Sequence, residues 1–522
     1  MRTGPRPRNR GTVRASAWSV ALTGIEGVVV EVEAAKGGGL PRTQLVGLPD
    51  KSLSEAKDRV KAAVRAFDLP WPPQLITINL SPANLPKAGS HYDVAIAVAA
   101  IAAEGGIRPG LLGKTVLFGE LSLDGRIRNV RGVLPAMLAA ARAGFECAIV
   151  PSAQTDEAEL VPGLTVWGAG RIDEVVSILA GVPVAQPTES AASSSLPPVE
   201  ATAYVPDLAE VVGHETGRFA LEVAAAGRHH LFLHGPPGVG KTMLASRLPT
   251  LLPALTNEES LEVSAIHSLA GHQLSGLISR PPYADPHHSV TPVALLGGGS
   301  GELKPGAISL AHRGVLFLDE CPDFGPKLDA LRTPLENGTI TISRARASAL
   351  FPARFQLVLA ANPCPCGMFG VAGADCRCDS VKVRRYRERI SGPILDRIDI
   401  RHQMLGANRV LMDVAGTPPE SSAVVAARVA EARQRQRHRL ADTPWATNGE
   451  VAGPYLRKGL PLPNDLSILN GALERGALSL RGVDKVLRVA WTLADLSGHD
   501  RVGPLELRVA LRLRQGDQPQ AA

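Results

Sequence analysis

One segment, Gly235-Pro-Pro-Gly-Val-Gly-Lys-Thr242, constrains the fold of this chain more than any other. It follows a short apolar run, Leu231–His234, and precedes a stretch of helical character that begins at Met243. A glycine, any four residues and then Gly-Lys-Thr, placed between a strand and a helix, is the pattern of a loop whose backbone N–H groups surround the phosphates of a nucleotide. Glycines are needed there because side chains would block the close approach of the backbone. The segment predicts a nucleoside triphosphate site, and the strand-helix alternation after it predicts a parallel sheet flanked by helices.

The last two residues of this loop have distinct predicted roles. Lys241 is expected to reach the β- and γ-phosphates, and the hydroxyl of Thr242 is expected to bind Mg²⁺. The other predicted nucleotide-binding residues are the rest of the loop: Gly235, Pro236, Pro237, Gly238, Val239 and Gly240.

Two later strands end in polar residues suited to hydrolysis of the nucleotide. The first is a buried-type strand that leads into Asp319 and Glu320. Asp319 is suited to the outer shell of Mg²⁺, and Glu320 is suited to polarising the attacking water. The second strand leads into Asn362. If this strand lies in the sheet between the first and the strand before the phosphate loop, Asn362 is near the γ-phosphate, where it can orient the water.

Two arginines complete the predicted catalytic set. Arg397 lies in the short apolar segment 392–399, and Arg481 begins a predicted helix near the C-terminus. An arginine from the same chain or from a neighbouring subunit stabilises the charge on the phosphoryl oxygens in the transition state. Either arginine alone is more often a member of a structural ion pair, but in the company of the other parts the catalytic role is favoured.

Composition divides the chain of 522 residues into several parts, as its length predicts. The clearest boundary is a Pro-, Ser- and Ala-rich segment typical of a linker. The predicted parts are a disordered basic leader (1–14), an α+β domain (15–180), the linker (181–203), a nucleotide-binding core (204–405), a helical lid (406–514) and a disordered tail (515–522).

The chain shows no feature of a membrane or secreted protein. No run of about 18 or more apolar residues is present, so no membrane-spanning helix is expected. The arginine-rich first residues lack the apolar segment of a secretory signal. Six cysteines in so long a chain do not form a disulfide scaffold, and Cys147 and Cys321 are expected in the core. A cytoplasmic protein is the resulting expectation.

The net charge of +6 is modest for this length, but arginines are unevenly distributed. They gather in residues 384–389 and again in residues 428–439. Such runs are compatible with binding to nucleic-acid phosphates, and solvated helix faces are an equally common explanation.

Four of the cysteines form two Cys-x-Cys pairs, Cys364 with Cys366 and Cys376 with Cys378. Four thiolates can hold Zn²⁺ tetrahedrally, and such sites tie down short loops. The pairs predict a structural zinc site, with four reduced thiols or a redox-labile pair as the alternatives.

Six strings in the nucleotide-binding half carry a family resemblance. They are Gly314-Val-Leu-Phe-Leu-Asp-Glu320, Ala361-Asn-Pro-Cys-Pro-Cys-Gly367, Pro286-His-His-Ser289, Gly297-Gly-Gly299, Pro305-Gly-Ala-Ile-Ser-Leu-Ala-His312 and Arg389-Ile-Ser-Gly-Pro-Ile-Leu-Asp-Arg397. Together they resemble the magnesium-chelatase-like AAA+ ATPases of the YifB/ComM family, over roughly residues 15–515. The resemblance implies an α/β fold with an AAA+ core and a helical lid, assembled as a hexameric ring that hydrolyses ATP with Mg²⁺. It also implies that Asn362 is a first sensor, that Arg397 acts on the adjacent subunit's nucleotide, and that Arg481 is a second sensor.

The same resemblance extends to a predicted hairpin before the first sensor. The string Ile340-Thr-Ile-Ser-Arg-Ala-Arg346 matches a hairpin that lines the central pore and contacts DNA in related ring helicases. The resemblance therefore implies that Arg344 and Arg346 contact DNA.

The N-terminal domain resembles the Lon-protease-like fold. The resemblance rests on Leu117-Phe-Gly-Glu-Leu-Ser-Leu-Asp-Gly-Arg126 and Pro86-Lys-Ala-Gly-Ser-His-Tyr-Asp93. A protease of this type needs a serine activated by a lysine, because a free hydroxyl is a weak nucleophile. The position of that serine falls at His91, and the segment 132–136, where the lysine is expected, contains none. The domain is interpreted as a proteolytically inactive scaffold for the ring.

These observations favour a DNA-directed motor, for example one that drives branch migration during recombination. A metal-insertion ATPase acting on a tetrapyrrole and a protein-remodelling ATPase without a nucleic-acid partner are the alternatives. Salt-dependent binding to DNA separates the first from the other two, because phosphate contacts release counterions.

Overall fold

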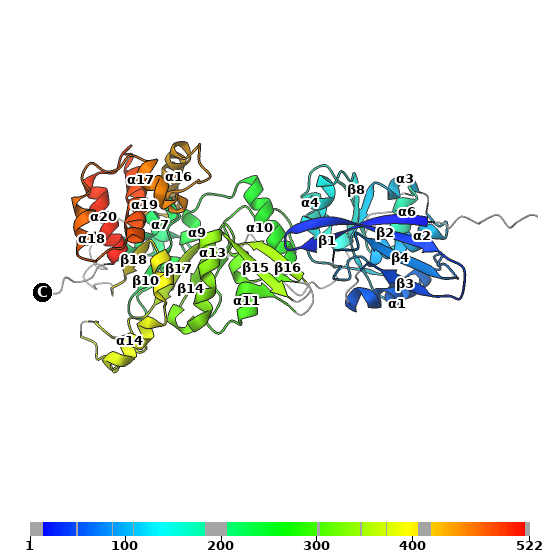
Figure 1. The fold of residues 1–522 in the computed structure, drawn as a ribbon, viewed down its shortest axis with the longest axis horizontal. Helices are drawn as coiled ribbons and strands as arrows, with labels where there is room; N and C mark the ends of the chain where they lie inside the picture. The colour runs from blue at the N-terminus through cyan, green and yellow to red at the C-terminus, as the bar shows by residue number, and fades with distance from the viewer. Residues whose placement is uncertain are drawn as a thin grey trace, which may run out of the picture.

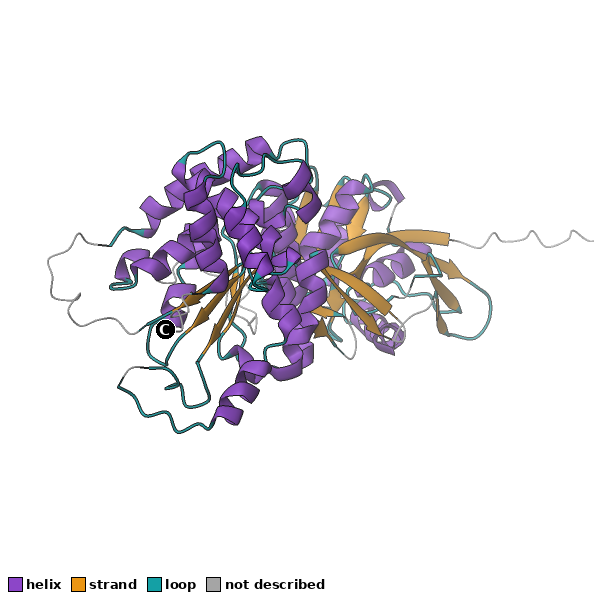
Figure 2. Cartoon of the chain, turned by 60° about the vertical axis from the view of Figure 1, so that its left-hand side comes forward, coloured by secondary structure: helices purple, strands orange, loops and turns teal. Residues whose placement is uncertain are grey.

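The computed structural model describes residues 14–516, except 48–50, 86, 108, 183–205, 300–302, 345–346, 372 and 406–418. The chain is elongated, with the N-terminal domain at one end and the C-terminal helices at the other (Figure 1). The strands form two separate groups, and most helices surround the group nearer the C-terminus (Figure 2). The predicted linker falls almost wholly on residues outside the described ranges.

The N-terminal domain is built on a mixed sheet of seven strands in the order β3-β4-β2-β1-β5-β8-β9. The first strand includes Arg14, which the sequence analysis assigns to the leader, because Arg14 pairs with Ala35 of the next strand. The strands of the sheet are β1 (Arg14–Thr23), β2 (Glu26–Lys36), β3 (Thr43–Val46), β4 (Ile76–Ser81), β5 (Thr115–Leu117), β8 (Cys147–Pro151) and β9 (Thr165–Ala169), and a separate small ladder joins β6 (Glu120–Leu121) to β7 (Ile127–Arg128).

Helices cover both faces of this sheet, and each face has its own hydrophobic cluster. One cluster includes α1 and α2, and the other includes α4. Helix α2 consists almost entirely of Ala, Val and Ile, so it is buried on nearly all sides. The helices are α1 (Lys51–Arg65), α2 (Asp93–Ala103), α3 (Pro109–Leu112), α4 (Val133–Arg142), α5 (Thr155–Glu159) and α6 (Ile172–Leu179), with a 3₁₀ turn at Ser152–Gln154.

The second domain contains a parallel sheet of five strands in the order β11-β14-β17-β10-β18. Strand β17 lies between β14 and β10, which is the arrangement that the sequence analysis requires for Asn362. In β14 the side chains of Val315 and Phe317 enter one core cluster and those of Leu316 and Leu318 enter the other, so this strand is apolar throughout. The strands are β10 (Leu231–His234), β11 (Tyr283–Ala284), β14 (Val315–Leu318), β17 (Gln356–Ala361) and β18 (Ile400–Gln403).

Helices and two short hairpins surround this sheet. The hairpins are β12 (Gly297–Gly298) with β13 (Lys304–Pro305), and β15 (Thr339–Arg344) with β16 (Ala347–Pro352). The helices are α7 (Glu215–Gly227), α8 (Lys241–Ala245), α9 (Leu248–Leu251), α10 (Asn257–Ala270), α11 (Pro292–Leu296), α12 (Ala307–Leu310), α13 (Arg332–Asn337), α14 (Ser380–Glu388) and α15 (Gly392–Arg397), with 3₁₀ segments at Leu208–Glu210 and Cys321–Leu331.

The C-terminal helices pack against α7 and share its hydrophobic cluster, which contains the buried Trp491. They are α16 (Ser422–Arg439), α17 (Gly453–Lys458), α18 (Ser467–Glu474), α19 (Leu480–Ser497) and α20 (Pro504–Gln515), with a 3₁₀ turn at Asn448–Glu450. The last helix includes Gln515, which the sequence analysis assigns to the tail, and residues 517–522 lie outside the described ranges.

The second arginine run, on α16, holds these helices to the core. Arg428 forms ion pairs with Glu222 and Glu420. Arg433 donates hydrogen bonds to the carbonyl of Ala225 at the end of α7. Arg428 and Arg433 are thus engaged within the protein, because packing of α16 on α7 brings acceptors within their reach.

The two domains meet where α10 contacts α4. The Ser268 hydroxyl donates a hydrogen bond of 2.5 Å to Oε1 of Glu157, whose other neighbours include the Leu134 N–H. The backbone N–H of Gly132 donates to the Ser268 carbonyl at 3.2 Å. Glu157 is only 1% exposed, and burial raises the pKa of its carboxyl above the ordinary value. A buried polar contact therefore joins the domains.

Among the helices of the described ranges, none combines the length and the apolar character that crossing a membrane requires.

Candidate nucleotide site and cysteine cluster

The predicted phosphate loop connects β10 to α8 at the carboxyl edge of the five-stranded sheet. A side chain at Gly235 would collide with the backbone, since its Cβ would lie 2.2 Å from the Met404 carbonyl oxygen. The loop is therefore packed closely against the chain that follows β18. Glycine at this position is a requirement of the fold as well as of phosphate binding.

The Lys241 ammonium lies at the centre of the loop. It donates hydrogen bonds to the carbonyl oxygens of Gly235 at 2.8 Å and Pro236 at 2.9 Å, and to Oδ1 of Asn362 at 2.9 Å. Burial lowers the pKa of Lys241, and the charges of Asp319 and Glu320 oppose that shift. The structure thus brings together the lysine, which begins α8, and the expected first sensor, which follows β17.

The predicted magnesium ligands are also in contact. The Thr242 hydroxyl donates a hydrogen bond of 2.6 Å to Oδ2 of Asp319. The second carboxylate oxygen of Asp319 accepts a hydrogen bond of 2.8 Å from the Glu320 N–H. A hydroxyl and a carboxylate at this distance can share the coordination shell of Mg²⁺, which prefers oxygen ligands.

Glu320 adopts a left-handed backbone conformation, with φ of 48°. For a residue other than glycine this conformation costs about 1–2 kcal/mol. This backbone conformation ends β14 and turns the Glu320 side chain away from the strand. Half of that side chain is exposed. Strain of this kind persists only where neighbouring groups hold it, and Asp319 supplies one such contact.

His288 is a residue of this site to which the sequence analysis gave no role. Its Nδ1 lies 3.1 Å from Oε2 of Glu320, and its ring contacts that of His287 in a tilted arrangement with centroids 4.0 Å apart. Lys327 donates hydrogen bonds to the carbonyls of His288 and Val290, which anchors the loop. The string Pro286-His-His-Ser289 drew attention to this loop, but its approach to Glu320 depends on the tertiary fold.

Arg397 and Arg481 lie together, away from the phosphate loop of their own chain. Both line a cavity of about 600 Å³ that also includes His230 and Arg354. His230 precedes β10, whereas the phosphate loop follows it. The strand alone separates the two edges by about 10 Å at ~3.3 Å per residue. The structure therefore places both arginines at the amino edge of the sheet.

The Arg397 guanidinium is held in place by its own domain. It donates a hydrogen bond of 2.7 Å to the Pro393 carbonyl and pairs with Glu336. Arg481 begins α19, as expected, and Leu480 beside it is 71% exposed.

The predicted hairpin is present as β15 and β16, with register from Thr339 opposite Pro352 to Arg344 opposite Ala347. The backbone of Arg344 ends β15, whereas Arg346 lies outside the described residues. Gly24, at the turn between β1 and β2, lies against the Leu350 carbonyl, so the hairpin also contacts the N-terminal domain.

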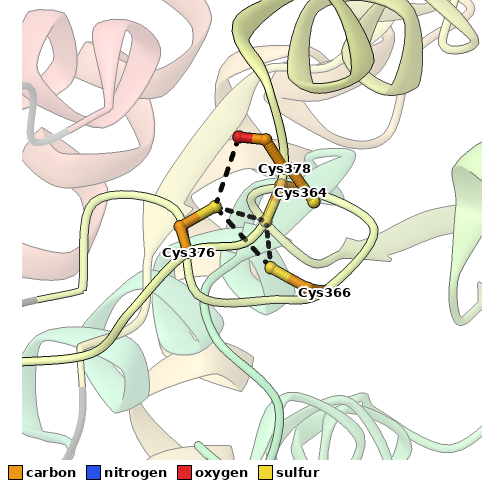
Figure 3. A group of neighbouring side chains, drawn as sticks. All are labelled: Cys364, Cys366, Cys376 and Cys378. Atoms are coloured by element: carbon orange, nitrogen blue, oxygen red, sulfur yellow. Dashed lines mark hydrogen bonds between the residues drawn. The ribbon is translucent and has the colours of Figure 1, made fainter.

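The four cysteines of the two Cys-x-Cys pairs converge, with all four Sγ atoms within 4.8 Å of one another (Figure 3). The Cys364 Sγ lies 3.3 Å from that of Cys366 and 3.8 Å from that of Cys376. Tetrahedral zinc with Zn–S bonds of about 2.3 Å requires sulfur separations of about 3.8 Å. The Met368 backbone N–H and the Cys364 thiol lower the pKa of Cys366, whereas the pKa values of Cys376 and Cys378 are raised, so the thiols of the cluster share their protons unequally. The donor set and its geometry fit zinc.

In the N-terminal domain, His91, at the expected position of a Lon-type serine, and two neighbouring polar residues each have partners of their own. His91 is buried and its Nε2 lies 3.0 Å from the Val20 carbonyl oxygen. The Ser90 hydroxyl donates to Glu120, and the buried Lys87 ammonium donates to the Pro82 carbonyl. Ser90 and Lys87 are therefore bonded to separate groups.

Family models of magnesium chelatase match this chain in three places. Residues 207–410 match the model described as "Magnesium chelatase, subunit ChlI", residues 30–154 match "Subunit ChlI of Mg-chelatase", and residues 419–514 match "Magnesium chelatase, subunit ChlI C-terminal". The matches cover both domains and the C-terminal helices.

Full-length relatives give the same assignment. The chain is 39% identical to the competence protein ComM of Haemophilus influenzae, over 96% of this chain and 97% of that protein. It is 39% identical to YifB of Escherichia coli, over 95% of this chain and 96% of that protein. A segment covering 30% of this chain is 28% identical to 21% of the Lon protease of Mycolicibacterium smegmatis. With two relatives of this identity along almost its entire length, the chain belongs to the YifB/ComM family of magnesium-chelatase-like AAA+ ATPases.

Proposed function

We propose that this chain binds ATP and Mg²⁺, hydrolyses ATP within a hexameric ring, and uses the energy to remodel DNA, as in branch migration. The observation that carries the ATPase part is the meeting of the Lys241 ammonium with Asn362 and of the Thr242 hydroxyl with Asp319 at one edge of the sheet. These groups come from three adjacent parallel strands, whose carboxyl ends form a common binding crevice.

The residues of the site have separate tasks in this proposal. The loop N–H groups and Lys241 bind the phosphates, and Thr242, with Asp319 behind it, would hold Mg²⁺, which would offset the phosphate charge. Glu320 accepts a proton from the attacking water, and Asn362 orients that water. Since hydrolysis needs the Glu320 carboxylate whereas binding does not, the two steps can be separated by mutation.

Arg397 and Arg481 act on the nucleotide of a neighbouring subunit. Their shared cavity lies at the opposite edge of the sheet from the phosphate loop of the same chain. In a closed ring, a head-to-tail interface brings one such edge against the other edge of the next chain. The exposed Leu480 belongs to the same interface.

The DNA part of the proposal is supported by the hairpin and by family. Arg344 is the last residue of β15 in this hairpin, and Arg346 follows it by two residues in the sequence. The relative from Haemophilus influenzae is named a competence protein. Of the two arginine runs, that on α16 is engaged within the protein, so the hairpin is the stronger candidate for DNA contact.

The cysteine cluster is proposed to hold one structural Zn²⁺ through Cys364, Cys366, Cys376 and Cys378. Elemental analysis of purified protein should give about one zinc per chain, and serine at Cys376 and Cys378 should abolish it. Well-folded wild-type protein without metal would contradict this assignment.

The N-terminal domain is proposed to be a Lon-like scaffold without protease activity. The separate partners of Ser90 and Lys87, and the buried His91 where the serine is expected, support this. Its contact with α10 through Glu157 suits a domain that holds the ATPase core in place.

ATPase rates and nucleotide binding of two variants test the ATPase part. Lys241→Ala should lose nucleotide binding, because the ammonium contacts the phosphates. Glu320→Gln should bind ATP normally and hydrolyse it at least about a hundredfold more slowly, because only the proton acceptor is lost. Turnover by Glu320→Gln at the wild-type rate would refute the role of Glu320.

DNA titrations at several salt concentrations test the DNA part. Binding to single-stranded or forked DNA should weaken steeply as salt increases, and DNA should stimulate the ATPase. Glutamine at Arg344 and Arg346 should reduce both effects while leaving the basal ATPase unchanged. An ATPase indifferent to DNA would instead favour the magnesium-insertion function that the matching family models indicate, or remodelling of a protein.

A further inference from the structure

The loop between the two cysteine pairs contacts the phosphate loop. Gly367 has φ of +80°, and a Cβ placed on it would lie 2.5 Å from Cδ and 2.9 Å from Cγ of Pro237. The Gly367 backbone is therefore in direct contact with the proline ring. Because that ring is rigid and belongs to the phosphate loop, a shift of Gly367 toward it must displace the phosphate loop.

A second connection runs through Asn362. Cys364 follows Asn362 by two residues and is buried, so the position of its sulfur restricts the backbone that carries the Asn362 side chain. The Asn362 Oδ1 in turn accepts a hydrogen bond of 2.9 Å from the Lys241 ammonium. Pro237 is thus contacted from the cysteine loop itself, and Lys241 from Asn362, two residues before the loop begins.

The first end of the cysteine loop has contacts that do not involve sulfur. Arg387 of α14 donates a hydrogen bond of 3.3 Å to the Pro363 carbonyl and lies over the Phe369 ring at 5.0 Å. The Phe369 N–H donates to the Cys364 Sγ at 3.3 Å. The second pair, Cys376 and Cys378, reaches the first through sulfur contacts. A metal ion at the four thiolates would join the two pairs through metal–sulfur bonds.

We propose that the metal-bound cysteine cluster is a positioning element for the nucleotide site, which holds Pro237 and Asn362 in the geometry that binds ATP. This rests on the zinc and nucleotide sites of the proposed function, and it adds a role beyond tying down a loop. With the metal bound, Gly367 supports the phosphate loop before nucleotide arrives. Without it, nucleotide binding must also order both loops, and this conformational entropy lowers the affinity.

A matched pair of glycine variants isolates the contact. Gly367→Ala inserts a methyl group against Pro237 and keeps all four cysteines. Gly370→Ala is the control, since Gly370 has a similar φ of +74° in the same loop but nothing within 4 Å of its Cβ position. Both variants therefore carry the same left-handed strain, and they differ in the collision with the phosphate loop.

The measurements are the dissociation constant of a fluorescent ATP analogue with Mg²⁺ in excess, the zinc content, and the thermal unfolding midpoint. Gly367→Ala should retain about one zinc per chain and bind the analogue at least about tenfold more weakly than Gly370→Ala. If the two variants unfold at different temperatures, binding is measured well below both unfolding midpoints, so that both proteins are fully folded in the assay. Equal affinities of the two variants would overturn the proposal.

A second arm changes the metal and leaves the sequence intact. Removal of zinc from the full-length protein by a zinc-selective chelator should weaken binding of the analogue by about tenfold or more, and added Zn²⁺ should restore it. Unchanged affinity after complete metal loss would overturn the coupling even though both sites exist. Wild-type protein that never contains metal would refute the zinc site, and protein that never binds the analogue would refute the nucleotide site, so each failure is distinguishable.

Discussion

The position of Arg397 at the amino edge of the sheet makes a quantitative prediction about mixed rings. Arg397→Ala should leave the fold intact, because its partner Glu336 is 57% exposed and can be solvated by water. The variant keeps its own phosphate loop, so it should still bind ATP. Its ATPase rate in a homogeneous ring should fall by about a thousandfold, the usual effect of removing such an arginine.

Mixing with Lys241→Ala should restore activity. A productive interface then needs an intact phosphate loop from an Arg397→Ala chain and an intact arginine from a Lys241→Ala chain. In an equal mixture each of these partners is present about half the time, so about a quarter of the interfaces are productive. The rate should therefore approach about a quarter of the wild-type value per ring, far above either variant alone.

A second mixture tests the placement of Arg481 beside Arg397. If both arginines serve the neighbour, Arg481→Ala should also be rescued by Lys241→Ala, and Arg397→Ala mixed with Arg481→Ala should stay inactive. The reason is that every interface of the last mixture lacks one of the two arginines. The assay is steady-state ATPase of rings assembled from mixed monomers. No rescue of Arg397→Ala, or rescue in the last mixture, would refute the reasoning.

Three further outcomes are expected. His288→Ala should lower kcat for ATP about tenfold and leave KM unchanged, because the imidazole contacts Glu320 and not the nucleotide; equal changes in both constants would contradict this. Burial lowers the pKa of His229 to about 4, whereas the ordinary histidine pKa is about 6.5. Between these pH values the unfolded chain binds a proton at His229 and the folded chain does not. The free energy of unfolding should therefore fall as pH drops below about 6.5, by up to about 1.4 kcal/mol per pH unit from this group until pH 4. A denaturation series across that range measures it, and constant stability would refute the assignment. Glu157→Ala should cost about 2 kcal/mol in chemical denaturation, because the Leu134 N–H and the Ser268 hydroxyl lose a buried acceptor, whereas Glu157→Gln should cost less.

The nucleotide site could be predicted from sequence because its parts are local. Each part is a strand followed at once by a polar residue, as in Asp319 and Asn362, or by the phosphate loop. In a parallel sheet the carboxyl ends of such strands share one edge, so the order of the strands suffices to bring the side chains together. The cysteine pairs converge for a related reason, since a short loop joins them.

Other residues could not be placed in this way because their partners are distant in sequence. The contact between His288 and Glu320 depends on how the loop after β11 folds over β14. The arginines of α16 bond to α7 only because the C-terminal helices dock there. Their charge alone was equally compatible with DNA and with solvent.

The sequence by itself determined that the chain has a phosphate loop, two polar strand ends, a cysteine cluster and helices toward the C-terminus, because each of these follows from spacing along a few turns or strands. Only the tertiary structure decided that Arg397 and Arg481 share a cavity at the far edge of the sheet, and that Gly367 touches Pro237. Both facts depend on the docking of one element on another, which is set by the packing of buried surfaces and is not encoded in any single segment.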